Sequence, residues 1–428
     1  MFEYFPENVQ IVIASAALLI AGIEFYRSHK NIKITKFKTI YRLLSRGRFI
    51  YSDITRQIYK SKYSNEVIDC SFLISKKDWI PDDIKDLSYL TVEYNEFRIS
   101  EIKHIKLKSS LRNGRFDFSL LPDSRAGYSE NIRRYIEKNM FNGEGCKLIE
   151  EPILENGKLA LNISKCYYFE YQDTCEYMAY QSVNSINEKS LYHYRCENDC
   201  LNQKYLLSQA CYLKDLFDFK NRHVMIGLCV LTVIKNIGQK GNDYFLIHKR
   251  SDNTAEAMNT ISLVPSGTLE WFPGADLSQI IEDGVTREYD EEVLGMSELE
   301  ITEKYIPRKI WLEELGRSEI CKNTDHITNI HFAGMGLDPL NTKMEIIVRL
   351  DIDASVSKIL PFEELYLKLK TKISDGKTIS LKDDVSGSYE GTLFLVPYSK
   401  ENVYRMMNNK RGMSVFREAM RLTLRDIG

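Results

Sequence analysis

A short acidic stretch, residues 287–295, decides how the rest of the chain is interpreted; it reads REYDEEVLG. On a helix that turns about 100° per residue, Glu288, Glu291 and Glu292 fall within an arc of roughly 100°. Like charges on one face repel each other, whereas Mg²⁺ prefers carboxylate oxygens and usually accompanies a phosphorylated ligand. The stretch therefore predicts a divalent-metal site, and the alternative is a solvated acidic helix face.

The residues around this stretch have the spacing of a helix that packs against a core. Apolar side chains recur every four residues, at Ile281, Val285, Tyr289 and Val293. Gly295 is of the residue type that commonly follows a helix C-terminus. We expect a helix from about Leu277 to Leu294, with Arg287 one turn before Glu291 and paired with it.

The residues before the helix predict the remainder of a phosphate site. Apolar runs at 224–234 and 244–248, separated by glycines, predict a hairpin whose second strand ends in Lys249 and Arg250. A third strand, 261–265, leads to Gly267. Strand, glycine loop and acidic helix in this order can supply amides, cations and carboxylates to a metal-bound pyrophosphate. We therefore expect Lys249, Arg250 and Gly267 to contact the phosphates.

This order of elements resembles the Nudix hydrolase family. The family motif is Gly, five residues, Glu, seven residues, then Arg-Glu-apolar-x-Glu-Glu-x-Gly-apolar. Its second half matches Arg287, Glu288, Tyr289, Glu291 and Glu292 position by position, and Gly295 and Met296 follow with one extra residue. The first half departs from the motif, because Gln279 stands at the expected glutamate and Pro273 at the expected glycine.

The resemblance covers about residues 223–400 and implies an α+β fold, in which helices flank a mixed sheet. It also implies attack of water on the pyrophosphate of a nucleoside diphosphate derivative, with Mg²⁺ or Mn²⁺ held by Glu288, Glu291 and Glu292. Glu292 is expected to be catalytic, and Glu292 or Glu270 is the expected general base. The departures at Gln279 and Pro273 leave a second hypothesis open, a domain that senses a nucleotide without hydrolysing it.

An apolar segment near the N-terminus, residues 8–26, predicts a single transmembrane helix. Residues 8–23 carry no charge, and residues 27–51 then carry eight basic side chains and no acidic one. The positive-inside rule places the N-terminus outside and the bulk of the chain in the cytoplasm, with the membrane as a partner. The alternatives are a buried N-terminal helix and a cleaved signal peptide.

Length and composition give the remaining predictions. The 428 residues divide into the transmembrane helix (8–26), a basic juxtamembrane helical linker (27–60), an unassigned α/β region (61–215) and the Nudix-like domain (223–428). A net charge of −2 gives no reason to expect a nucleic-acid partner, so the expected ligand is a nucleotide or another pyrophosphate compound. Nine scattered cysteines predict reduced thiols. The zinc-like spacing of His193, Cys196 and Cys200 lacks a second pair and is interpreted as packing. The oligomeric state stays open.

Overall fold

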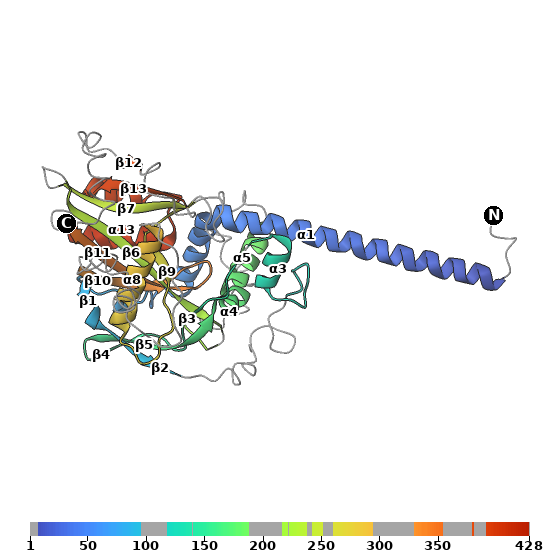
Figure 1. Cartoon of the computed structure of the whole chain (residues 1–428), viewed down its shortest axis with the longest axis horizontal. Helices are drawn as coiled ribbons and strands as arrows, with labels where there is room; N and C mark the ends of the chain where they lie inside the picture. Colours follow the sequence, from blue (N-terminus) through green and yellow to red (C-terminus); the bar gives the residue numbers. More distant parts are fainter. Residues whose placement is uncertain are drawn as a thin grey trace, which may run out of the picture.

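The computed structural model describes residues 7–95, 118–138, 140–187, 216–220, 222–237, 242–250, 260–293, 329–353, 379–380 and 391–427. These residues form an α+β molecule around one curled sheet of 13 strands, with helices on both of its faces (Figure 1). The sheet is mixed, because parallel and antiparallel pairs both occur in it. All descriptions below refer to this part of the chain.

Strand β6 (Val224–Ile237) lies at the centre of the sheet. Its apolar side chains are buried on both faces, which explains why its sequence is a continuous apolar run rather than an alternating one. One edge pairs in parallel with β11 (Met344–Asp353). The other edge pairs antiparallel with three strands in turn: β3 (Glu144–Leu148), β9 (Ser266–Thr268) and β7 (Asn242–Arg250). Strand β6 therefore joins the N-terminal and C-terminal strands in one sheet.

The other strands extend the sheet from these neighbours. Beyond β11, the order is β10 (Asn329–Leu337) and then β1 (Lys85–Asp86). Beyond β3, it is β5 (Lys158–Tyr167), which also pairs with β2 (Leu90–Tyr94) and β4 (Ile153–Glu155). Strand β7 also pairs with β8 (Ile261–Ser262) and with β13 (Gly391–Pro397), and β13 pairs with β12 (Ile379–Ser380).

Helices cover both faces of the central strands. On one face, α8 (Leu277–Glu292) packs against β6, and the regularly spaced Ile281, Val285, Tyr289 and Val293 are all buried. On the other face lie α12 (Lys400–Met407) and α13 (Ser414–Ile427), whose apolar sides form a second core. The predicted hairpin and the start of the acidic helix are confirmed.

The N-terminal part adds a helical layer with an aromatic core. It consists of α1 (Glu7–Lys62), α3 (Tyr128–Tyr135), α4 (Tyr168–Tyr171), the π-helix η3 (Gln172–Glu176) and α5 (Tyr177–Asn187). Buried rings from α1, α3 and α5 contact one another, among them Phe37, Tyr128 and Tyr180. Two 3₁₀ turns, η1 (Lys77–Trp79) and η2 (Leu87–Tyr89), flank β1. Figure 1 shows that the N-terminal part of α1 extends away from the rest of the molecule.

The predicted transmembrane helix, and with it the predicted fold class of a membrane-anchored protein, is wrong. Residues 8–26 belong to α1, which continues to Lys62. No helix in the described part of the chain has an apolar segment long enough to cross a membrane. The apolar run Ile11–Ile23 rises only about 20 Å, whereas a bilayer core measures about 30 Å. The predicted location, with the N-terminus outside and the bulk in the cytoplasm, depended on this helix and is corrected with it.

Candidate functional site

Two of the predicted metal ligands lie one turn apart near the end of α8, against β9. Glu292 is buried, and its Oε2 accepts a hydrogen bond from the backbone N–H of Ser266 at 2.9 Å. The carboxylate of Glu288 covers Gly267, where a Cβ atom would lie 2.1 Å from Glu288 Oε1. The glycine leaves room for Glu288, and the backbone of β9 orients Glu292.

The pairing of β9 with β6 explains why this glycine faces the helix. Gly267 lies opposite Leu228, and residues directly opposite each other in an antiparallel pair point to the same face. Leu228 packs in the core beneath α8, and its side chain approaches Gly284 of that helix. The register of two strands therefore places Gly267 beneath the acidic end of α8.

Arg287 connects the helix to the loop that follows β9. Its guanidinium forms ion pairs with the neighbouring Glu288 and with Glu270, two residues beyond β9. The sequence predicted a pair between Arg287 and Glu291, and the structure describes these two other partners. Four carboxylates, those of Glu270, Glu288, Glu291 and Glu292, lie on this loop and helix with one arginine, so the local charge favours a cation.

The three glutamates of α8 do not converge on a single point. Within the described residues, one group of three potential ligands has all its ligand atoms within 4.8 Å of one another, and it consists of Cys166, Glu170 and His223. Magnesium commonly takes only one or two carboxylates and completes its shell with water and substrate phosphates. Glu288 and Glu292 supply hard oxygen donors, and the amide of Ser266 orients one of them. Binding of Mg²⁺ or Mn²⁺ by these carboxylates stays a prediction.

Lys249 and Arg250 lie at the end of β7, with Lys249 exposed and Arg250 half-buried. There Lys249 pairs with Ile261 of β8 and Thr392 of β13. Strand β7 pairs with β6 through residues 242–245, at the opposite end of β7 from Lys249. Strand β9 pairs with β6 at residues 227–229. The contact of Lys249 and Arg250 with a phosphate stays a prediction.

One buried carboxylate was missed by the sequence analysis. Glu345 of β11 lies opposite Gly227 of β6, where a Cβ atom would be 2.1 Å from Glu345 Oε2. The thiol of Cys229 donates to the same oxygen at 3.4 Å, and Lys343 Nζ lies 3.8 Å from the other oxygen of this carboxylate. Burial raises the pKa of Cys229, and Glu345 raises it further. The available signal was a single acidic residue within the apolar run 344–350.

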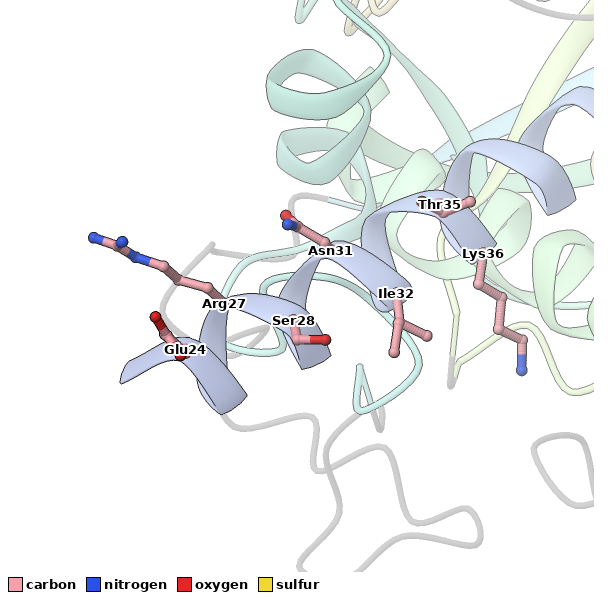
Figure 2. A pocket seen from close by; sticks show the side chains of 7 residues that line it. All are labelled: Glu24, Arg27, Ser28, Asn31, Ile32, Thr35 and Lys36. Carbon is pink, nitrogen blue, oxygen red and sulfur yellow. The ribbon is translucent and has the colours of Figure 1, made fainter. Parts of the chain in front are cut away.

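A surface hollow on α1 is unrelated to these carboxylates. Its lining side chains extend from Glu24 to Lys36 along a single helix, and Figure 2 shows them pointing to several sides of it. Ligand pockets bury most of a ligand by drawing side chains from several elements. This hollow therefore has the geometry of an open helix surface, and the end of α8 is the better candidate site.

The zinc-like spacing of His193, Cys196 and Cys200 lies outside the described residues, as does Gly295. Among the described residues, the thiols of Cys70, Cys146, Cys166, Cys175 and Cys229 form no disulfide, and the prediction of reduced cysteines stays a prediction. Comparison with known proteins adds no identity to this geometry. No protein-family model matches the chain, and no curated protein matches it in sequence.

Proposed function

We propose that the protein is a metal-dependent hydrolase that cleaves the pyrophosphate bond of a nucleoside diphosphate derivative, in the manner of Nudix enzymes. The observation that carries the proposal is the placement of Glu288 and Glu292 against β9, one over Gly267 and the other on the amide of Ser266. One carboxylate oriented by a backbone amide and a second that lies over a glycine, on a helix with excess negative charge, suit a divalent cation that arrives with phosphate groups.

Each side chain of the proposed site has a separate task. Glu288 and Glu292 would hold Mg²⁺ or Mn²⁺, which supplies charge neutralisation at the phosphate oxygens and a more acidic bound water. The Ser266 amide keeps the Glu292 carboxylate oriented, so that this carboxylate can accept a proton from the attacking water. Arg287 holds Glu288 and Glu270 near each other by its two ion pairs. Glu270 is the second candidate for the general base.

Turnover by the full chain tests the proposal. We would incubate it with Mg²⁺ and a panel of nucleoside diphosphates linked to sugars, alcohols or a second nucleotide, and separate the products by chromatography. Glu292→Gln should lower the rate by about 10²-fold or more, because both metal binding and proton transfer are affected. Glu282→Gln is the matched control, since Glu282 lies on the exposed side of the same helix. Absence of turnover, or equal rates for Glu292→Gln and the wild type, would contradict the proposal.

A second candidate is a domain that binds a nucleotide without hydrolysing it. The observation that favours it is that Arg287 already forms ion pairs with Glu288 and Glu270. In addition, Gln279 stands at the position where the family motif has a glutamate. Calorimetric titration with the same nucleotides and Mg²⁺ distinguishes the two candidates. Binding without any product over long incubation would favour the sensor, and the absence of binding would contradict both.

A further inference from the structure

Three potential metal ligands meet at the junction between the N-terminal strands and β6. Cys166 lies near the end of β5, Glu170 in the short helix α4 that follows, and His223 immediately before β6. Strand β3 pairs with both β5 and β6, so it brings these segments together, although His223 is 57 positions after Cys166 in the sequence. The group lies apart from the glutamates of α8 and has no part in the function proposed above.

The distances within the group suit one metal ion. All its ligand atoms lie within 4.8 Å of one another, and His223 Nδ1 is 3.8 Å from Glu170 Oε2. A tetrahedral zinc ion with bonds of about 2.0–2.3 Å separates its ligand atoms by about 3.3–3.8 Å. The remaining distances between ligand atoms must shorten by less than the length of one carbon–carbon bond to match this spacing. A thiolate and an imidazole together favour Zn²⁺ over Mg²⁺.

The ligands are also held from outside the group. Glu170 Oε2 accepts a hydrogen bond from the Tyr167 amide at 2.9 Å. The π-helix η3 anchors the backbone of His223, whose N–H donates to Thr174 Oγ1 at 3.3 Å and whose carbonyl accepts from Cys175 Sγ at 3.4 Å. Such outer contacts orient metal ligands in known sites.

Lys147 of β3 stands against the same ligands. Its Nζ lies 3.3 Å from His223 Nδ1, and the Glu170 carboxylate favours its charged form. The ammonium group of Lys147 thus occupies the place where a bound metal ion would be attracted to the three ligands. A metal ion must displace it, since two positive charges cannot share so small and buried a site.

We propose that Cys166, Glu170 and His223 bind one Zn²⁺ ion, with a water molecule as fourth ligand, in competition with the ammonium group of Lys147. The thiol of Cys166 loses its proton to solvent as the sulfur–metal bond forms, so binding strengthens as pH rises. The ion would connect β5 and α4 to the start of β6, and so stabilise the junction between the two parts of the sheet.

Cobalt titration of the full chain tests this site, because a thiolate bound to tetrahedral Co²⁺ gives a charge-transfer band and visible absorption that Zn²⁺ abolishes. Cys166→Ser should remove the charge-transfer band, whereas Cys229→Ser, which changes another buried thiol of the sheet, should retain it. A band that persists in Cys166→Ser, or disappears in Cys229→Ser, would overturn the assignment. Circular dichroism confirms that each variant is folded.

Lys147→Met gives a stronger test, because it should raise the affinity for Co²⁺ rather than lower it. Removal of the ammonium should raise the affinity for Co²⁺ at least tenfold, whereas a variant that merely disturbs the fold would lower it. If Cys166→Ser does not fold, Glu170→Gln replaces it as the test. This variant should weaken Co²⁺ binding about tenfold and keep the thiolate band at saturation. Absence of a thiolate band in both the wild type and Lys147→Met would overturn the proposal. None of these readouts depends on a substrate.

Discussion

Two arginine–glutamate networks in this molecule have the same chemistry and different surroundings. In the first, Arg48 of α1 donates to both oxygens of Glu176 in η3, and the two side chains are 5% and 3% exposed. Glu176 also accepts from Tyr171 at 2.7 Å and from Asn341 at 2.6 Å. In the second, Arg287 pairs with Glu288 and Glu270, and all three are between 12% and 17% exposed.

The difference lies in what completes each network. Glu176 receives donors from α1, α4 and the loop before β11, so protein groups alone hold it. Burial by itself would raise the pKa of Glu176, but Arg48, Asn341 and Tyr171 keep that pKa below its usual value. Around Arg287, carboxylates outnumber the one arginine, and the group lies at the end of a helix. The first network, called closed, connects elements of the fold, whereas the second, called open because it is more exposed, is the place where we propose that a cation binds.

The largest expected effect comes from opening the closed network. Arg48→Met leaves Glu176 buried without its charged partner, which should lower the free energy of unfolding by about 3–5 kcal/mol in urea titrations. Replacing both residues, with Glu176→Gln added, should recover part of the loss because no charge is then buried. Arg46→Met is the control on the exposed side of α1 and should change stability by less than about 0.5 kcal/mol. A loss for Arg46→Met as large as that for Arg48→Met would refute the distinction.

The second largest expected effect comes from His248, a buried base, and concerns the dependence of stability on pH. His248 of β7 is fully buried, and its ring nitrogens have no hydrogen-bond partner among the described residues. Burial, with a smaller contribution from Arg250, lowers its pKa to about 4. Below about pH 6.5, His248 binds a proton in the unfolded chain but not in the folded chain. The free energy of unfolding therefore falls as the pH falls towards 4. The expected loss between pH 7 and pH 5 is about 2 kcal/mol.

Urea unfolding at the two pH values measures this loss, and His248→Leu separates it from other titrations. The variant should lose about 2 kcal/mol less than the wild type over the same interval, since leucine does not titrate. An equal loss in both proteins would show that His248 is protonated in the folded state, or paired in a way that the structure does not describe.

The open network can be disturbed without changing its charge. Gly267→Ala places a methyl group where the Glu288 carboxylate lies, and this flexible side chain must move away. We expect affinity for Mn²⁺, measured by calorimetry, to fall about tenfold with little loss of stability. Gly284→Ala is the control, because its methyl group would meet only Leu228, at 3.1 Å. Equal Mn²⁺ affinities for Gly267→Ala and Gly284→Ala would place the metal away from Glu288.

The smallest effect belongs to a third arginine pair, which is partly open to water. Arg417 of α13 donates to both oxygens of Asp53 of α1 at 2.9 and 3.0 Å, and the Asp53 side chain is 38% exposed. Asp53→Asn should lower the free energy of unfolding by about 0.2–1 kcal/mol, and salt should reduce the difference. A loss equal to that of Arg48→Met would mean that burial does not set the strength of these pairs.

Local patterns in the sequence predicted the C-terminal half well. The four-residue spacing of Ile281, Val285 and Tyr289 identified the buried side of α8, and the apolar runs identified β6 and β7. The same kind of pattern misled at the N-terminus. The apolar run at 11–23 is part of α1, but it is too short to cross a bilayer core of about 30 Å.

Contacts distant in sequence could not be predicted. The Glu270–Arg287 pair depends on the register of β9 with β6, and the cluster of Cys166, Glu170 and His223 depends on the pairing of β3 with two strands. The sequence of β3, EGCKL, has too little periodicity to indicate a strand at all. Glu345 was missed for a related reason, since only Gly227 on the neighbouring strand makes room for it.

The length of α1 has a mechanical consequence for the closed network. Glu7 precedes Arg48 by 41 residues, which corresponds to about 62 Å of helix, and no side chain described between 24 and 36 is fully buried. From Phe37 onward α1 is packed in the aromatic core, so a tilt can involve only the part of the helix before Phe37. That part is about 45 Å long, and a tilt of about 10° would displace its start at Glu7 by about 8 Å. The Arg48–Glu176 pair helps to hold the packed part of α1, and Asn341 links this pair to the loop that leads into β11.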